Sequence, residues 1–293
     1  MPLSLQTGVP AVLDEVIEAV ALMQMEGSPV QLHPGDLGWA SRFGVDALAS
    51  SLRVWRRGPE IVAVGMVDTN DGLIRMAISP MVDDDAGVAE RLVADLSDPA
   101  RGVLPSGRAQ VEARAGAAIR RLLQHSNWVP DEAWTPLRRN LSRDVEDCGM
   151  EVAMLDVEHI DDRLVRDRVT VGRASFENST FTIDRWHAMA ASPTYRRGRC
   201  LIAYDSQGAA VAATTVWSAG VGKPGLIEPL GVHRDHRGLG FGRAITIAAA
   251  ATLRDMGSSS VTVCTPSANV RAVAAYASAG FEELPAVTDF RRP

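Results

Sequence analysis

The spacing of hydrophobic residues predicts alternating helices and strands in the first half of the chain. Val12, Val16, Val20 and Met23 recur near the 3.6-residue period of an amphipathic helix, which is expected over residues 11–25. Short apolar runs separated by turn-forming residues follow, as in a meander of strands. These strands are expected at residues 52–55, 61–67 and 73–78, with helices at 88–96 and 115–125 and strands at 127–129 and 134–141.

The second half of the chain repeats this order after a polar stretch at residues 142–147, which we interpret as a linker. Strands are expected at residues 151–155, 200–204, 209–218, 226–232 and 260–265, and helices at 160–171, 183–190, 239–256 and 269–279. The two halves agree in length and element order but not in detailed sequence. We therefore predict a degenerate internal duplication, with one module at residues 1–145 and another at 146–293.

The composition is that of a folded protein with two domains of ordinary size. A single core rarely organises more than about 250 residues. This chain has 293, of which 46% are hydrophobic and 23% charged. The net charge of −6 argues against a nucleic-acid partner, because binding a polyanion requires a basic face. Local basic pockets for small phosphates remain compatible with this balance.

The three cysteines, Cys148, Cys200 and Cys264, lie far apart and form no C-x-x-C pair. This spacing suggests neither a disulfide framework nor a zinc site, and it fits free thiols in a reducing cytoplasm. No apolar stretch reaches the length of a transmembrane helix, and the first residues lack the pattern of a signal peptide. We expect a cytoplasmic protein that has no membrane partner.

The strongest chemical signal is a glycine-rich segment between a predicted strand and an alanine-rich helix. It reads LGVHRDHRGLGFGR from Leu230 to Arg243. Glycines let a phosphate approach the backbone closely, and the N–H groups at a helix start have no acceptor within the helix. The spacing R-x-x-G-x-G fits neither the dinucleotide fingerprint nor the P-loop. We therefore predict a pyrophosphate site, to which Arg237 and Arg243 add charge-assisted hydrogen bonds.

Two segments together resemble the GNAT superfamily of N-acetyltransferases. The run HRDHRGLGFGRAI is similar to that superfamily's acetyl-CoA segment, with the pattern R/Q-x-x-G-x-G/A at a strand-to-helix junction. The run from Asn269 to Phe281 resembles its second motif, N-x-x-A-x-x-x-Y-x-x-x-G-F. The resemblance covers roughly residues 151–290. It implies an α/β (α+β) fold of two GNAT-like modules, each with a mixed, mostly antiparallel sheet flanked by helices.

The resemblance assigns residues of the second half to acetyl-CoA, which acts as a co-substrate. Leu230 and Val232 would offer backbone groups to the pantetheine arm, where the fourth strand splays from the fifth. Asn269 would hydrogen-bond the coenzyme, and Tyr276 would lie near its sulfur. The pyrophosphate would be held by Arg237, Gly238, Gly240, Gly242 and Arg243.

Acetyl transfer to an amine requires a neutral amine, stabilisation of an oxyanion and a proton for the leaving thiolate. Tyr276 is suited to donate that proton, because the ordinary pKa of a tyrosine is about 10. Glu228 interrupts an apolar strand just before the coenzyme segment, and it is the best candidate for the base. An equally open alternative is that this carboxylate fixes a neighbouring loop. His233 and His236 lack a third ligand in the sequence, so no metal site is expected.

The corresponding segment of the first half, residues 79–88, has lost these features. It reads SPMVDDDAGV, in which three aspartates replace the arginine and the glycines. The like charges would repel a pyrophosphate. The later segment, residues 114–128, has no tyrosine. We expect the first module to bind no coenzyme and to complete a pseudo-dimer that walls the substrate pocket.

Three functions remain open from the sequence. The preferred one is an N-acetyltransferase acting on a primary amine of a small molecule, peptide or protein. The alternatives are a non-catalytic acyl-CoA-binding sensor or interaction protein, and an acetyltransferase resembling mycothiol synthase, which also has two modules. Retention of Tyr276 and Asn269 favours the enzyme, because binding alone requires no tyrosine hydroxyl. The aromatic residues within 176–186 fit an ammonium site or the underside of a packed helix, and the oligomeric state is left open.

Overall fold

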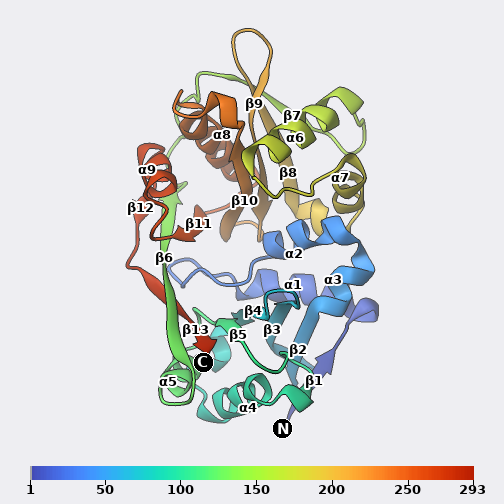
Figure 1. Cartoon of the computed structure of the whole chain (residues 1–293), viewed down its shortest axis with the longest axis vertical. Coiled ribbons are helices and arrows are strands. Elements are labelled where there is room, and N and C mark those ends of the chain that lie inside the picture. The colour runs from blue at the N-terminus through green and yellow to red at the C-terminus, as the bar shows by residue number, and fades with distance from the viewer. Residues whose placement is uncertain (1) are drawn as a thin grey trace. The chain divides into compact units, whose positions relative to one another are not determined.

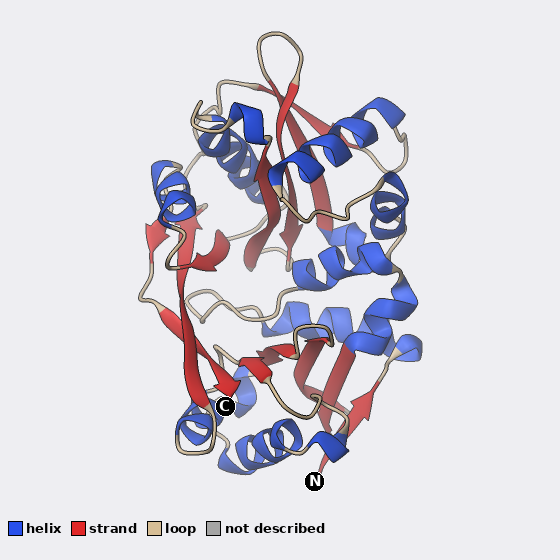
Figure 2. Cartoon of the chain, viewed as in Figure 1, coloured by secondary structure: helices blue, strands red, loops and turns tan. Residues whose placement is uncertain are grey.

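A computed structural model describes residues 2–293 of the chain, which divide into two compact units. The first unit contains residues up to 33, 46–134 and 285–293, and the second contains residues 34–45 and 135–284. Figures 1 and 2 show that each unit is a sheet with helices packed on it. No helix within residues 2–293 has both the length and the apolar character that a membrane crossing requires.

The sheet of the first unit is antiparallel except at one pair of strands. Strands β1 to β4 pair in sequence order, β5 is parallel to β4, and β13 lies between β5 and the first part of β6. The strands are β1 (Leu3–Thr7), β2 (Leu52–Arg57), β3 (Glu60–Asp68), β4 (Leu73–Ile78), β5 (Ala109–Glu112), β6 (Val129–Asn140) and β13 (Val287–Arg292). The helices are α1 (Leu13–Met23), α3 (Val45–Ser51), α4 (Ala86–Ser97) and α5 (Ala117–Gln124).

The second unit repeats this order of elements. Strands β7 to β10 pair antiparallel, β11 is parallel to β10, and the second part of β6 lies on the other side of β11. The strands are β7 (Glu151–Leu155), β8 (Gly198–Tyr204), β9 (Ala210–Ser218), β10 (Pro224–Val232), β11 (Ser260–Pro266) and β12 (Glu282–Glu283), which pairs with β6. The helices are α2 (Pro34–Ala40), α6 (Asp162–Ser175), α7 (Ile183–Ala190), α8 (Phe241–Asp255) and α9 (Val270–Ser278).

Local sequence accounts for the helices that periodicity predicted. In α1, Val16, Val20 and Met23 are buried on one face, and Asp14 and Glu15 in the first turn complement the helix dipole. The structure adds elements that the pattern did not predict, namely β1, α2, α3, β5, β12 and β13. It also joins the two strands expected at residues 127–129 and 134–141 into the single strand β6.

Each unit includes a segment from the other half of the sequence, whereas the expected boundary was one cut between residues 145 and 146. Residues 34–45 belong to the second unit, where α2 packs on Trp217 of β9. A Cβ atom at Gly35 would lie 2.6 Å from the Trp217 ring, and one at Gly38 only 2.2 Å. The indole therefore fills the space that side chains would occupy, and this explains a helix with two glycines.

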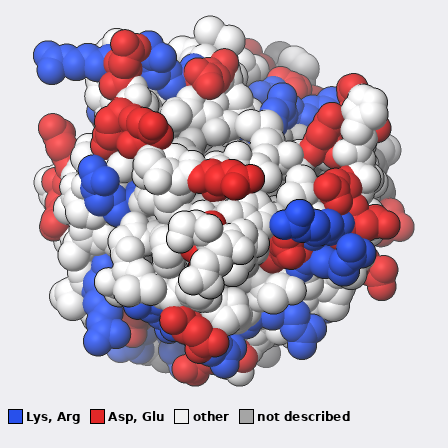
Figure 3. All heavy atoms as spheres, turned by 90° about the horizontal axis from the view of Figure 1, so that it is seen from above, with Lys and Arg blue, Asp and Glu red and all other residues white. Residues whose placement is uncertain are grey.

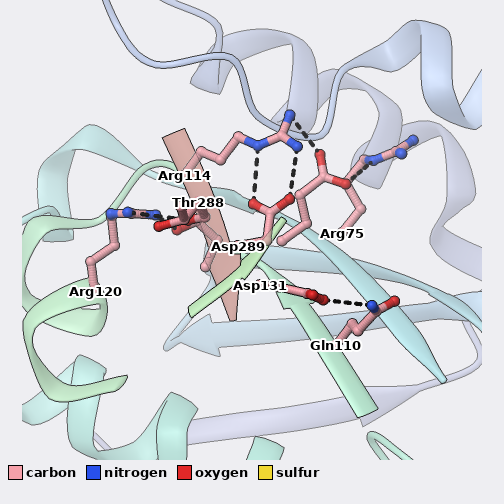
Figure 4. A network of polar contacts seen from close by, with 9 residues as sticks. Arg75, Gln110, Arg114, Arg120, Asp131, Thr288 and Asp289 are labelled. Carbon is pink, nitrogen blue, oxygen red and sulfur yellow. Dashed lines mark hydrogen bonds and ion pairs between the residues drawn. The ribbon is translucent and has the colours of Figure 1, made fainter. Parts of the chain in front are cut away.

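The strand β13 belongs to the first unit, and a buried ion-pair network fixes it there (Figure 4). Arg114 donates to both carboxylate oxygens of Asp289, at 3.1 and 2.8 Å. Arg114 also lies 3.1 Å from Glu112, which pairs with Arg75 at 2.9 Å. Burial raises the pKa of Asp289, and the Arg114 guanidinium partly offsets that shift. Removing one partner of such a buried pair costs about 3–5 kcal/mol, so the network ties the end of the chain to β5.

Candidate functional site

Strand β10 separates from its parallel neighbour after the first third of its length. It pairs with β11 only from Pro224 to Leu226, although both strands continue beyond this point. On its other side the register with β9 shifts between Ile227 and Leu230, which marks a bulge. The resemblance predicted this splay of the fourth strand from the fifth.

Side chains of β9 satisfy the carbonyl groups of the bulge. The indole N–H of Trp217 donates to the Glu228 carbonyl at 2.6 Å, and the Thr214 hydroxyl donates to the Pro229 carbonyl at 3.0 Å. Trp217 and Thr214 are fully buried. These two residues fix the backbone at Glu228 and at the residue that follows it. Sequence reasoning did not identify them, because their contacts depend on the register of β9 against β10.

The start of α8 is an open helix N-terminus. Its N-cap residue is Gly240, with a φ of 87°, and no side chain accepts a hydrogen bond from the first turn. A Cβ atom at Gly238 or Gly240 would meet nothing within 4 Å. Free N–H groups, the positive end of the helix dipole and open space together suit a phosphate group. Gly242 follows within the first turn, close to Val232.

Two arginines of the predicted phosphate loop also hold neighbouring helices. Arg237 donates to the Ser175 carbonyl at the end of α6, at 2.6 Å. Arg243 donates to the Ser278 carbonyl at the end of α9, at 2.9 Å, and lies 3.7 Å from Glu146. A guanidinium has five N–H donors, so each arginine keeps donors for a further partner. Both positive charges therefore remain beside the α8 N-terminus.

A close approach of α6 to β10 borders the splay. A Cβ atom at Gly231 would lie 2.5 Å from Ser175 and 3.3 Å from Phe176. Only glycine therefore permits this contact. Of the aromatic residues expected near the acceptor, Phe176 is exposed, but Phe181 and Trp186 are buried in the core. Phe181 and Trp186 therefore belong to the underside of packed helices, which was one of the two roles considered from the sequence. Of these three aromatic residues, only Phe176 is available to a ligand.

Glu228 and Tyr276 come from different elements, and the charge of Glu228 acts on the Tyr276 hydroxyl. Tyr276 lies on α9 with its ring 5.6 Å from that of Phe281. Burial and the neighbouring Glu228 carboxylate raise the pKa of Tyr276 above its ordinary value. Its hydroxyl therefore holds its proton at neutral pH. Glu228 is half-buried in β10, directly at the bulge.

The remaining predicted coenzyme residues take defined structural positions. The Asn269 side chain caps α9 by accepting a hydrogen bond from the Ala272 N–H at 3.2 Å. The side-chain oxygen of Asn269 is therefore engaged in the cap, and a contact with a ligand would be made through the N–H donors of its amide group. Leu230 and Val232 lie on β10 beyond the splay, where both side chains pack against the core of the second unit.

Within residues 2–293, no group of three or more His, Cys, Asp or Glu side chains is arranged to hold a metal ion. The rings of His233 and His236 lie edge to face, 5.4 Å apart, and the His233 ring accepts a hydrogen bond from the Asp235 N–H. On the face drawn in Figure 3, basic and acidic side chains intermix around the rim, and an acidic side chain lies within the mostly uncharged centre.

Three comparisons with known proteins bear on this site. Residues 164–281 match the model of the acetyltransferase (GNAT) family. No curated protein sequence matches significantly. The chain is similar in fold to a tandem GNAT protein from the clavulanic acid biosynthesis pathway, with 15% identity, a TM-score of 0.60, and 99% of this chain and 98% of that chain covered.

Two further solved structures share the fold. An acetyltransferase of the GNAT family from Colwellia psychrerythraea is 16% identical, with a TM-score of 0.62 and complete coverage of both chains at 100%. A GCN5-related N-acetyltransferase from Sphaerobacter thermophilus is 18% identical, with a TM-score of 0.55, and 99% of this chain and 96% of that chain covered. The matched family is one of acetyltransferases, and its model covers the elements that carry the splay, the open helix and Tyr276. The second unit is therefore an acetyltransferase domain of the GNAT family, in a chain with the fold of a tandem GNAT protein.

Proposed function

We propose that the second unit binds acetyl-CoA and transfers its acetyl group to the nitrogen of a primary amine, in a small molecule, peptide or protein. The observation that carries this proposal is the open N-terminus of α8 next to the splayed strand β10, two features that suit the pyrophosphate and the pantetheine arm of the coenzyme. Glu228 on β10 and Tyr276 on α9, whose pKa the Glu228 charge raises, supply the base and the acid that aminolysis of a thioester requires.

The coenzyme would be held largely by backbone groups. The first turn of α8 has free N–H groups for the pyrophosphate, and Arg237 and Arg243 add positive charge beside it. Beyond Leu226, β10 has no strand partner on the β11 side, which leaves that edge open to the amide groups of a pantetheine arm. Leu230 and Val232 lie on this edge. Asn269 would add a side-chain contact.

The chemistry would follow direct attack. The Glu228 carboxylate takes a proton from the incoming ammonium, directly or through a water molecule, and the neutral nitrogen attacks the thioester carbonyl. A backbone N–H of the splayed strand stabilises the oxyanion. As the new C–N bond forms and the C–S bond breaks, the Tyr276 hydroxyl donates its proton to the leaving sulfur. The nitrogen then releases its second proton, which returns to the Tyr276 phenolate directly or through a water molecule, and Glu228 loses its proton to solvent. The products are an amide and the free coenzyme thiol.

The electrostatic link between the two residues would time the proton transfers. The negative charge of Glu228 raises the pKa of Tyr276. When Glu228 accepts the proton of the amine, that charge disappears, and Tyr276 becomes a stronger acid at the step that uses it.

The first unit would contribute structure and not chemistry. Residues 34–45 come from the first half of the sequence but belong to the second unit, where they cover Trp217, which fixes the Glu228 carbonyl. The role of this segment would be to hold the bulge and wall the acceptor side. None of the three cysteines, all within the described residues, forms a disulfide, which fits the cytoplasm, where we expect the enzyme to act.

A thiol-release assay of the purified full-length chain with acetyl-CoA tests the proposal. The panel would contain polyamines, aminoglycosides, aromatic amines and peptides, with calorimetry of acetyl-CoA in parallel. We expect one coenzyme site per chain and amine-dependent thiol release that Tyr276→Phe strongly reduces. Tight coenzyme binding without release above the hydrolysis background for every class of amine would favour a non-catalytic sensor instead.

A further inference from the structure

A buried arginine in the second unit has no acidic partner. Arg168 lies on α6, the helix that packs on β8, β9 and β10 (Figure 1), and only 2% of this residue is exposed. Its Nε–H donates to the Cys200 sulfur at 3.2 Å, and its Cζ lies 5.0 Å from the centre of the Phe181 ring. Within residues 2–293, no carboxylate lies at ion-pair distance from this guanidinium, and its buried Nη2 atom has no hydrogen-bond partner.

The positive charge of Arg168 persists in the core, because a guanidinium does not lose its proton in proteins. A buried charge is costly unless an opposite charge and hydrogen bonds compensate it. The face of the Phe181 ring attracts the guanidinium, but this attraction is weak beside that of an anion. The energetics therefore favour an anion next to Arg168.

Other hydrogen-bond donors in the same place are also buried without a partner. Thr215 is fully buried and lies directly opposite Cys200 in the pairing of β8 with β9. Tyr195 is 4% exposed, and the charges of Cys200 and Arg168 both act on its hydroxyl. Within the described chain neither hydroxyl has a hydrogen-bond partner, and the same holds for the indole N–H of Trp186 in the same core cluster.

The chemistry of this donor set suits an anion. Burial raises the pKa of Tyr195 well above its ordinary value, so its hydroxyl keeps its proton at neutral pH. The charged groups of the described chain that act on it are Cys200, Arg168 and Arg199, and no carboxylate is among them. A water molecule would accept from these donors but would leave the charge of Arg168 uncompensated. A Cys200 thiolate would compensate the charge, but neither the Tyr195 nor the Thr215 hydroxyl donates to that sulfur.

Tyr195 also borders a surface groove, through which a small ion can approach. The groove has a volume of about 700 Å³, and the charged residues that line it are Arg196, Arg199, Asp156 and Glu158. Asp156 is paired with His159 at 3.0 Å. Because the lining holds two residues of each sign, the groove does not repel an anion as a whole.

We propose that a chloride ion, or another halide of similar size, binds between the Arg168 guanidinium and the hydroxyls of Tyr195 and Thr215. A halide compensates the charge, accepts hydrogen bonds from several directions and has no hydrogen that needs an acceptor. The proposal goes beyond acetyl transfer and does not rest on it, because none of these three residues belongs to the coenzyme segment.

Bromide locates the site directly, since it resembles chloride and scatters X-rays anomalously. Crystals of the full-length chain grown in sodium bromide should show an anomalous peak within hydrogen-bonding distance of the Arg168 Nη2 atom and the Tyr195 hydroxyl. Density for a water molecule without an anomalous signal at this position would overturn the proposal.

Thermal unfolding then measures the binding in solution. The full-length chain is melted in mixtures of sodium chloride and sodium gluconate at one ionic strength, because gluconate is too large for the cluster. We expect Tm to rise by about 3–5 °C from gluconate to chloride, since a ligand that binds only the folded state stabilises it. Arg168→Met should abolish the rise, whereas Arg166→Met, an exposed change on the same helix, should keep it.

Two further variants separate the halide from other partners of Arg168. Tyr195→Phe removes one donor and keeps the ring, so the midpoint of the chloride titration should move about tenfold higher. An equal chloride response in the wild type, Arg168→Met and Tyr195→Phe would overturn the proposal. So would the ultraviolet absorbance of a thiolate at neutral pH that Cys200→Ser removes, because Cys200 would then be the counter-charge. Thiol release from acetyl-CoA tests the proposed acetyl transfer separately, so failure of one proposal leaves the other intact.

Discussion

The starts of α4 and α8 occupy the same place in the element order of the two units, but their N–H groups have different partners. At α4, Asp85 caps the helix by accepting from the Val88 N–H at 3.0 Å. Asp83 accepts from the Gly116 and Ala117 N–H groups at the start of α5, at 3.1 and 3.2 Å. At α8 the cap is a glycine, and no side chain serves the first turn.

The comparison shows that carboxylates of the chain itself can occupy the positions where an anion would bind. From the sequence, the three aspartates were expected to repel a pyrophosphate. The structure adds that Asp85 uses an N–H group in the first turn of α4, at the position where a pyrophosphate would bind, while Asp83 serves the start of α5. The same framework can thus present an open anion site in one unit and a closed one in the other, according to the side chains at a single turn.

The largest expected effect comes from closing the open helix start. Gly240→Val places a branched side chain where the coenzyme pyrophosphate would lie, and we expect acetyl-CoA affinity to fall by more than about 100-fold in calorimetry. Gly208→Val is the matched control, because Gly208 has a similar φ of 77° and equally open surroundings in a distant turn. Equal loss in both variants would point to general strain and not to the site.

The second effect concerns Tyr276, the proposed general acid on α9. The corresponding helix of the first unit, α5, has no tyrosine. Tyr276→Phe keeps the ring and removes the proton donor. General acid catalysis contributes about 10²–10⁴-fold, and a coenzyme thiol leaves fairly readily without help. We expect kcat to fall by about 100-fold with acetyl-CoA affinity nearly unchanged. Turnover within about twofold of the wild type at saturating substrate would leave the tyrosine a packing residue only.

A smaller loss is expected from Glu228→Gln, because an amine can also lose its proton to water. The rate should drop about tenfold near neutral pH, and the deficit should shrink as the pH rises and more of the amine is neutral without help. A steady-state pH profile of both enzymes measures this. If the ratio of the two rates were the same at every pH, the role of Glu228 would be to maintain the structure of the β10 bulge and not to transfer a proton.

The smallest effect is predicted for Asp85→Ala in the first unit. Loss of the helix cap should lower the melting temperature by about 2–4 °C without creating a second coenzyme site. The hydrogen bond from the Val88 N–H, followed by Arg57, lowers the pKa of Asp85. The folded state therefore favours the carboxylate, so the difference from the wild type should be complete above about pH 4 and fade as the pH falls below it. Calorimetric detection of two acetyl-CoA molecules per variant chain would contradict the prediction.

Local patterns sufficed for much of the fold, and the exceptions have physical reasons. The helix α7 and the strands β4 and β7 occupy the residues that periodicity predicted, since their buried faces follow simple spacing. The helix α2 could not be predicted, because its two glycines disfavour a helix until Trp217 packs against them. The placement of β13 in the first unit could not be predicted from local pattern either, since β13 is fixed there by Arg114, which is far away in sequence.

Some features of the candidate site could likewise be predicted from local sequence, and others depend on tertiary packing. Glycine spacing indicated the open start of α8, and Glu228 stood out as a charge inside an apolar strand. The second roles of Arg237 and Arg243 as partners of helix carbonyls depend on tertiary packing, as do Trp217 behind the bulge and Ser175 against Gly231. None of these contacts joins residues close in sequence, so no local pattern encodes them.

The placement of β13 has a consequence for synthesis of the protein. During translation this strand leaves the ribosome after every other strand of the first unit, yet it lies between β5 and β6. Until it arrives, both neighbouring strands carry unpaired backbone edges, and Arg114 has no Asp289 to face. The half of the protein that is made first therefore completes its sheet last, and a nascent chain must be protected from aggregation until residues 287–292 have emerged.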